Sequence, residues 1–355
     1  MFTLSILKRM IGSACVAAAL LLVAGPGCAA SRNDPSVLSQ STQFHSSLTP
    51  AVMNSTDLNG YLQTVGGRIV AAAKVADSQK IGPPSHFSGD TQWMFQDIQF
   101  HLVSSPTLNA FTTGGHHVYI YNQLFQLCQN EDQLAAVMAH EFGHIYCRHV
   151  QKGMTHQMLL AAAAVGAGGA GYLVGGSERG AEYAQLGSSA GASVGGFINM
   201  GFTRGDEAQA DQYGQIFYAM AGWDPAHFRD FFQVMKDKLG DVASAYMSDH
   251  PTLQSRIEAA DKAAPGLEPK RPNPPPGPVA DVGQFRQFQQ TAVQVASRTP
   301  NDQQVLNTKQ LLQALPRSCW VPDGYVPPDQ AEAQKALIEK AKKLQEQQQK
   351  QPQTK

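Results

Sequence analysis

Residues 138–149 read MAHEFGHIYCRH, and this stretch decides the fold because it places two histidines and a glutamate inside one strongly patterned helix. Asn130 is a good N-cap, and Gln133 occupies the third helical position of a capping box. Apolar residues then recur at three- and four-residue intervals, namely Leu134, Val137, Met138, Phe142 and Ile145. This spacing predicts an amphipathic helix with one face buried against a core.

The same helix carries the side chains of a candidate zinc site. His140 and His144 are four residues apart, so both imidazoles lie on one side of the helix, one turn apart, and can converge on one ion. Glu141 lies beside them, where its carboxylate can act as a general base on a water molecule without binding the ion. Surface histidines on an exposed helix are the alternative, but they leave unexplained why both adjoin an apolar stripe.

A catalytic zinc ion needs a third protein ligand, and a second stretch of the chain offers one. Residues 204–214 read RGDEAQADQYG, in which Glu207 and Asp211 are again four residues apart on an expected helix. The alanines between them allow close packing against another helix. On spacing alone, either carboxylate can face the ion.

These stretches resemble the gluzincin family of zincin metallopeptidases that contains the type 1 CAAX prenyl proteases, HtpX, and the periplasmic BepA-like and LoiP-like proteases. Four landmarks occur in the family's order: NAFTTGG at 109–115, HEFGH at 140–144 followed by Arg148 and His149, EAQAD at 207–211, and DHPTLQSRI at 249–257. The resemblance covers roughly residues 50–265 and is strongest to the soluble, exported lipoprotein branch.

The resemblance implies a role for each matching residue. Glu207 becomes the third zinc ligand, and Asp211 becomes a carboxylate that orients a ligand histidine. His250 and Arg256 become residues near the active site that stabilise the oxyanion or gate the zinc, with a structural role as the alternative for His250. The alternative for Arg148 and His149 is that they are ordinary cations that interact with the dipole at the C-terminal end of a helix.

A small sheet is expected before the HExxH helix. Residues 96–103 (QDIQFHLV) and 117–121 (HVYIY) alternate apolar side chains, and the NAF segment between them is the expected edge strand. Asn109, Ala110 and Phe111 are therefore the candidate strand against which an extended peptide substrate pairs, although Asn109 can also simply hold a turn. His116 and His117 have no helical partner, and their position favours edge or turn residues over metal ligands.

These observations predict an α+β fold, mostly helical, of the zincin-like type with a small β-sheet beside the HExxH helix. The expected division of the chain is a signal peptide at 1–27, a tether at 28–50, a zinc metallopeptidase domain at 51–265, a proline-rich linker at 266–280, a small helical extension at 281–328 and a charged, glutamine-rich tail at 329–355.

The first thirty residues predict export. Lys8 and Arg9 precede an apolar run at 10–24, which has the length of a signal-peptide core and is short for a membrane span. Cys28 lies in a stretch that resembles a bacterial lipobox, although Gly25 stands where leucine is usual. Acylation of Cys28 would attach the protein to a membrane of the cell envelope; cleavage after Ala30, giving a secreted soluble protein, is the alternative.

Net charge and cysteine content bear on two questions, whether the protein binds nucleic acid and which disulfides it can form. Without residues 1–27 the chain has 25 basic and 28 acidic residues, so nucleic acid is not an expected partner. A disulfide between Cys128 and Cys319 is one option in an oxidising compartment, whereas Cys147 fits a small buried apolar residue. Residues 158–177 carry no charge, but their glycines and alanines favour closely packed helices or a flap over a membrane span.

The sequence therefore predicts an exported metalloendopeptidase with one Zn²⁺ per chain. It would hydrolyse unfolded or misassembled envelope proteins in protein quality control, with Glu141 as the general base. Outer-membrane assembly machinery is a partner that the resemblance implies, but no helical repeat follows the protease stretch, which leaves the partner open. The alternatives are a zinc-binding chaperone or pseudoprotease that holds peptides, and a hydrolase of cell-wall peptides.

Overall fold

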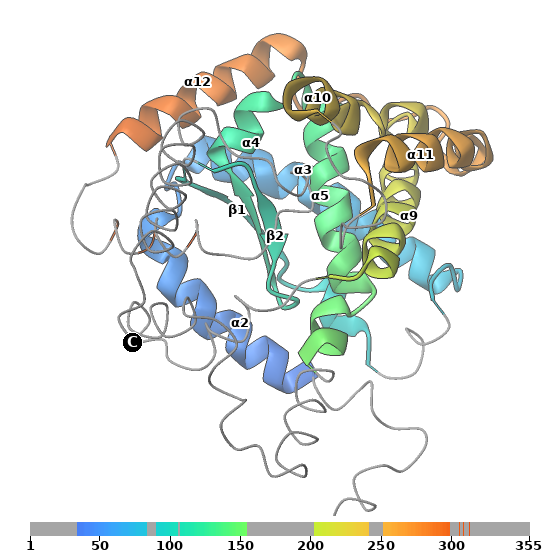
Figure 1. Cartoon of the computed structure of the whole chain (residues 1–355), viewed down its shortest axis with the longest axis horizontal. Coiled ribbons are helices and arrows are strands. Elements are labelled where there is room, and N and C mark those ends of the chain that lie inside the picture. The colour runs from blue at the N-terminus through green and yellow to red at the C-terminus, as the bar shows by residue number, and fades with distance from the viewer. Residues whose placement is uncertain are drawn as a thin grey trace, which may run out of the picture.

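The computed structural model describes residues 34–83, 90–105, 107–154, 202–240 and 251–298, together with positions 305, 308 and 312. In this part of the chain, helices surround a small sheet (Figure 1). The elements are α2 (Asp34–Leu48), η1 (Thr49–Ala51), α3 (Thr56–Ser78), η3 (Gln92–Phe95), β1 (Gln99–Val103), β2 (Ala110–Thr112), β3 (His117–Tyr121), α4 (Asn122–Leu127), α5 (Glu131–Tyr146), α9 (Arg204–Met220), η4 (Pro225–His227), α10 (Asp230–Leu239), α11 (Leu253–Leu267), η5 (Glu268–Lys270) and α12 (Val282–Arg298). The predicted α+β, mostly helical fold is confirmed.

The sheet has the strand order β1-β3-β2, which places the NAF segment at an edge as predicted. β1 runs parallel to β3, and β2 pairs with β3 in the antiparallel direction, with Phe111 opposite Tyr119. Figure 1 shows β2 on the side of the sheet that lies towards α5. The edge strand and the HExxH helix are therefore neighbours.

Side-chain alternation along the strands divides the interior into two cores, because successive residues point to opposite faces of the sheet. Phe100, Leu102 and Val118 belong to the larger core, which they share with α3, α5 and α9. Tyr119 and Tyr121 belong to a smaller core on the other face, where α2 packs. The sheet thus separates α2 from α5.

The structure corrects the interpretation of residues 28–50 as a tether, since α2 is a folded helix from Asp34. Val37, Phe44 and Leu48 are fully buried, and Ser41 is almost fully buried with them. These residues recur every three or four positions and form a narrow buried stripe. Polar residues lie between these buried positions and dominate the composition of the segment. Composition therefore did not indicate a buried helix face.

The HExxH helix begins at the predicted N-cap. Asn130 Oδ1 accepts a hydrogen bond from Gln133 N at 3.1 Å, whereas Gln133 Oε1 accepts from Gln129 N and not from the N-cap residue itself. Glu131 in the first turn is buried and accepts hydrogen bonds from the backbone N–H groups of Val279 and Ala280. The proline-rich stretch therefore packs onto the start of α5.

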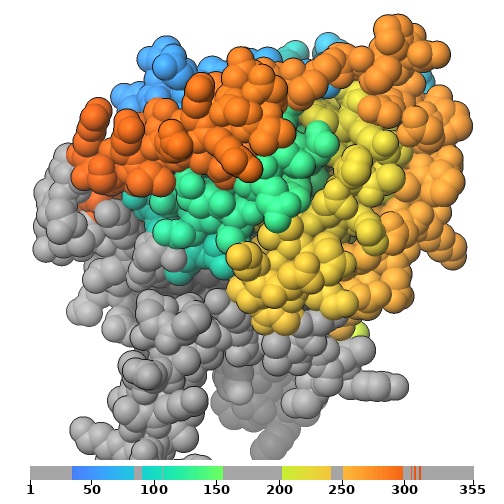
Figure 2. Space-filling model, turned by 90° about the horizontal axis from the view of Figure 1, so that it is seen from above, coloured from blue at the N-terminus to red at the C-terminus, as the bar shows by residue number. Residues whose placement is uncertain are grey.

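Helix α12 covers the end of the larger core, as expected for a helical extension. Figure 2 shows it beside the start of the α4–α5 region, and Gln289 Nε2 donates hydrogen bonds to the carbonyl oxygens of Phe125 and Cys128. Cys128 is buried and forms no disulfide with another described residue. Cys319 lies outside the described residues, so its pairing with Cys128 stays a prediction.

Two glycines let α5 and α9 approach closely. A Cβ atom on Gly143 would lie 2.7 Å from the carbonyl oxygen of Ala210, and a Cβ on Gly214 would lie 3.0 Å from the Cα of His140. Contacts this short leave room only for hydrogen at these positions. The two helices therefore pack backbone against backbone, and this places the first turns of α9 beside the histidines of α5.

Among the described residues, no helix is both long enough and apolar enough to cross a bilayer. The glycine- and alanine-rich segment at 158–196, predicted as packed helices or a flap, lies outside these residues.

Candidate metal centre

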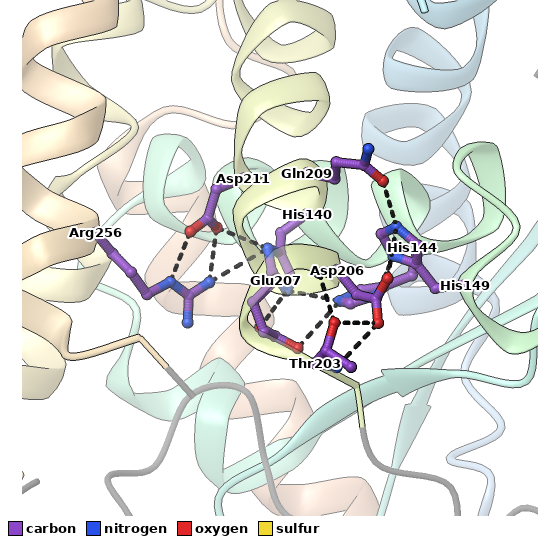
Figure 3. Close-up of polar contacts among 9 residues, drawn as sticks. All are labelled: His140, His144, His149, Thr203, Asp206, Glu207, Gln209, Asp211 and Arg256. Carbon is purple, nitrogen blue, oxygen red and sulfur yellow. Dashed lines mark hydrogen bonds and ion pairs between the residues drawn. The ribbon is translucent and has the colours of Figure 1, made fainter. Parts of the chain in front are cut away.

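Two helices bring three metal-binding side chains together. α5 supplies His140 and His144, α9 supplies Glu207, and all three side chains are fully buried (Figure 3). The Nε2 atoms of the two histidines are 3.0 Å apart, and the carboxylate oxygens of Glu207 lie 3.6 Å from His140 Nε2 and 3.7 Å from His144 Nε2.

These distances fit a zinc ion. Ligand atoms about 2.0–2.1 Å from a tetrahedral zinc ion lie roughly 3.3 Å from one another. The observed separations of 3.0, 3.6 and 3.7 Å bracket this value. Two imidazole nitrogens and one carboxylate also match the ligand set of catalytic zinc sites, which keep the fourth position open.

A capping box fixes the start of α9 and with it the position of Glu207. Thr203 Oγ1 accepts a hydrogen bond from Asp206 N, and the Asp206 carboxylate accepts one from Thr203 N at 3.0 Å. The Asp206 carboxylate also forms an ion pair with Lys152. Glu207 follows in the first turn, so its carboxylate is positioned by a defined helix end.

The orientation of His140 is set by a largely buried ion pair, in which the side chain of Asp211 is 16% exposed and that of Arg256 is 2% exposed. Asp211 Oδ1 lies 2.8 Å from His140 Nδ1, and Arg256 donates from Nε and Nη2 to the two Asp211 oxygens at 2.8 and 2.7 Å. Burial alone would raise the pKa of Asp211, but Arg256 and His140 outweigh it and hold this pKa at about 2. The resulting carboxylate accepts the Nδ1 proton of His140, which leaves Nε2 as the nitrogen that faces the cluster.

Arg256 thus contacts Asp211, and its Nη2 lies 3.3 Å from His140 Nδ1. Its guanidinium also lies over the ring of Phe232, with the Cζ atom 4.2 Å from the ring centroid. This geometry favours a positioning role over direct stabilisation of an oxyanion.

A cavity of about 700 Å³ lies between α9 and α11. Asp211 and Arg256 line this cavity, but none of the three ligand side chains does.

The orientation of His144 is set by a third histidine. His149 Nδ1 lies 2.9 Å from His144 Nδ1, and His149 Nε2 lies 3.1 Å from Gln209 Oε1. With His144 Nε2 facing the cluster, its Nδ1–H donates to His149, and His149 Nε2–H donates to Gln209. Burial lowers the pKa of His149, consistent with the neutral ring that this chain of hydrogen bonds requires. Phe202 stacks on the His144 ring at a centroid distance of 4.0 Å.

Replacement of His149 by alanine is expected to weaken zinc binding, because it removes the acceptor that holds His144 in the metal-binding tautomer. Loss of such a partner typically costs about 10–100-fold in metal affinity. Competition with a chromophoric chelator measures the change in Kd, and His227→Ala is the matched control because His227 is a surface residue paired with Asp230. An unchanged Kd in His149→Ala, or an equal loss in the control, would contradict this role.

The contact between His144 and His149, and the contact between His149 and Gln209, were not predicted from the sequence. His149 is five residues after His144, which is not a helical contact spacing, and a turn at Arg148, whose φ is +56°, separates the two residues. That turn also sends Arg148 Nη2 to Asp34 Oδ2 at 3.1 Å. The Arg-His pair after HExxH was the available signal, but it did not indicate which contact each residue makes.

The structure places the other predicted site residues as follows. Glu141 is fully buried on α5, next to His140 in the chain. Asn109 is buried, and its carbonyl oxygen accepts a hydrogen bond from Tyr121 N, which extends the pairing of β2 with β3; Ala110 and Phe111 follow in β2. His250 lies outside the described residues.

An HExxH helix, a glutamate from a second helix and a neighbouring antiparallel edge strand define the gluzincin class of metallopeptidase fold. The model of peptidase family M48 matches residues 87–264, half of the chain. The chain belongs to this family, as the sequence landmarks predicted, and zinc is the metal that its members use.

Three kinds of relative illustrate the match. The beta-barrel assembly-enhancing protease of Yersinia pestis is 31% identical over 215 residues, which are 60% of this chain and 40% of that protein. The mitochondrial metalloendopeptidase OMA1 of Schizosaccharomyces pombe is 27% identical over 51% of this chain and 50% of its own length. Metalloprotease LoiP of Escherichia coli is 26% identical over 46% of this chain and 61% of its own length. The chain spans about two fifths of the length of the assembly-enhancing proteases that it matches.

Proposed function

We propose that the protein is an exported zinc-dependent metalloendopeptidase that cleaves unfolded or misassembled proteins of the cell envelope. The observation that carries this proposal is the buried cluster of His140, His144 and Glu207, with the carboxyl group of Glu141 on the same helix. A site that only bound zinc would have no need of a buried base beside its ligands.

The residues divide the chemistry between them. His140, His144 and Glu207 would hold one zinc ion, which supplies Lewis acidity toward water and toward the peptide carbonyl. Glu141 removes a proton from the attacking water and later returns a proton to the departing amine. Asp211 and His149 hold the two imidazoles in the tautomer that binds metal.

Strand β2 is the proposed binding strand for substrate. It lies at an edge of the sheet and on the side of α5, so an extended peptide that paired with Ala110 and Phe111 would run past the HExxH helix. Main-chain pairing fixes the direction and register of a peptide while tolerating many side chains. Such a mode of binding suits unfolded proteins of varied sequence.

The cellular setting is proposed from the sequence and from the names of relatives. The apolar run at 10–24 supports export, and acylation at Cys28 would attach the chain to a membrane. Several relatives are named beta-barrel assembly-enhancing proteases, which supports envelope protein quality control and a partner in outer-membrane assembly. We propose the predicted segments, with the catalytic domain at 51–265, as the organisation of the chain, except that α2 is folded.

Zinc removal tests the proposal. The zinc-loaded protein is expected to cleave casein, and a chelator is expected to remove the metal and the activity together. Restoring zinc should restore cleavage, because the ion supplies the Lewis acid that the chain lacks. Zinc content by atomic absorption and casein fragments by gel electrophoresis provide the two measurements.

Two outcomes would favour the other candidates. A zinc-loaded protein that binds unfolded casein without cutting it would support a peptide-holding chaperone. Cleavage of cell-wall peptides together with inert casein would support a cell-wall peptide hydrolase instead.

A further inference from the structure

Three other histidines meet on the face of the sheet that α2 covers. His101 lies in β1, His117 begins β3, and His45 comes from α2. One ring nitrogen of each lies within 4.8 Å of a ring nitrogen of the other two. Because the sheet separates α2 from α5, this cluster is distinct from the candidate metal centre.

The rings are close enough to share one ion. His101 Nε2 and His117 Nδ1 are 3.0 Å apart, the same separation as between His140 Nε2 and His144 Nε2 in the metal centre. The ring centroid of His45 lies 4.6 Å from that of His101 and 4.0 Å from that of His117. Two donors are therefore already at the spacing that a zinc ion requires, and the third is adjacent.

Burial disfavours protonation of the three imidazoles. Burial first, and then the charge of the neighbouring imidazoles, lower the pKa of His101 to about 4 and that of His117 to about 3. Burial also lowers the pKa of His45. A lowered pKa favours the neutral ring, and only a neutral imidazole nitrogen can bind a metal ion.

We propose that His45, His101 and His117 form a second metal site, for a divalent cation of the zinc and copper type, that clamps α2 to the sheet. A ligand set made only of imidazoles selects these ions over Mg²⁺ and Ca²⁺, which take oxygen ligands. Under this proposal His117, which was predicted as an edge or turn residue and begins the central strand β3, would be a metal ligand.

One ring has to turn for the site to close. The rings of His45 and His117 are stacked with 6° between their planes, so their nitrogens point side by side and not toward one point. His45 is the ring that would turn, because it is only partly buried on α2; its Nδ1 is now within hydrogen-bond distance of the Tyr119 hydroxyl, at 3.0 Å. Rotation about its side-chain bonds exchanges that hydrogen bond for a bond to the metal.

The clamp would strengthen the attachment of α2, which its buried residues already pack against the sheet. The N-terminal end of this helix is held where Asp34 accepts hydrogen bonds from Arg148 and Trp93. His45 lies near the other end. α2 begins six residues after Cys28. If Cys28 is acylated as proposed, metal at this site would also strengthen the link between the catalytic domain and the lipid-bearing N-terminal segment.

Metal stoichiometry of the full-length chain tests the site. In a His140→Ala/His144→Ala background, which lacks the first centre, metal-stripped protein is titrated with Zn²⁺ and separately with Cu²⁺. One equivalent of metal is expected to bind, to disappear when His101→Gln is added, and to persist when His227→Gln is added as the control. The Cu²⁺ complex should show coupling to imidazole nitrogens in its electron paramagnetic resonance spectrum.

The unmodified ligand set gives an independent check in case the background variant folds poorly. The parent chain is expected to bind two equivalents of Zn²⁺, and His101→Gln and His45→Gln are each expected to bind one. A parent that binds a single equivalent, or a second equivalent that survives in both variants, would overturn the site.

Hydrogen exchange of residues 34–48 tests the clamp itself. If metal binds only when α2 is docked, a free Zn²⁺ concentration 100 times the Kd should slow exchange through opening of α2 by about 100-fold. The measurement uses the background variant, so that the first centre does not contribute. Bound metal with unchanged exchange in α2 would overturn the clamp.

Discussion

Replacing Glu141 with glutamine is expected to lower kcat/KM for casein by roughly 10²–10⁴-fold, the usual contribution of a positioned general base. Glutamine keeps the size and the polarity of the side chain but cannot accept a proton from water. The zinc content should stay at the parent value, because His140, His144 and Glu207 are unchanged. The comparison therefore separates the loss of the base from the loss of the metal.

Glu258→Gln is the matched control for that variant. Glu258 is an exposed carboxylate on α11 outside the metal centre, so the same chemical change there should leave kcat/KM within about twofold of the parent, as expected for a surface substitution. Full activity in Glu141→Gln would remove the general-base role. Loss of zinc in Glu141→Gln would show that this carboxylate supports metal binding instead.

The HExxH helix could be predicted because its information is local. The N-cap at Asn130, the apolar stripe and the four-residue spacing of His140 and His144 all lie within a few helical turns, where periodicity fixes which residues share a face. The third zinc ligand could not be assigned from spacing alone, because Glu207 and Asp211 were both candidates. The family resemblance favoured Glu207, and the structure places it against both histidines and Asp211 behind His140.

The features that could not be predicted depend on tertiary contacts. The buried stripe of α2 consists of only four residues, Val37, Ser41, Phe44 and Leu48, and lies in a polar segment, so composition predicted a tether. His45, His101 and His117 have no common spacing, and only the pairing of β1 with β3 and the docking of α2 bring them together. The contact between His144 and His149 likewise requires the left-handed turn at Arg148.

Loss of Arg256 is expected to have the largest effect on stability. Arg256→Met keeps an apolar chain over Phe232 but leaves the carboxylate of Asp211 without the guanidinium that balances its burial. Removing one partner of a buried ion pair typically costs about 3–5 kcal/mol. The free energy of unfolding in urea, measured on metal-free protein so that zinc affinity does not enter, is expected to fall by an amount near the lower end of that range, because the Asp211 side chain is 16% exposed.

Two further variants show whether the cause is the unbalanced carboxylate. Arg229→Met removes an exposed ion pair between Arg229 and Asp261 in the same region of the fold. This change should lower the free energy of unfolding by less than about 1 kcal/mol. Arg256→Met/Asp211→Asn replaces the stranded carboxylate with a neutral amide, so it should be more stable than Arg256→Met alone. If the double variant is no more stable, Arg256 stabilises the fold through packing and not through its charge.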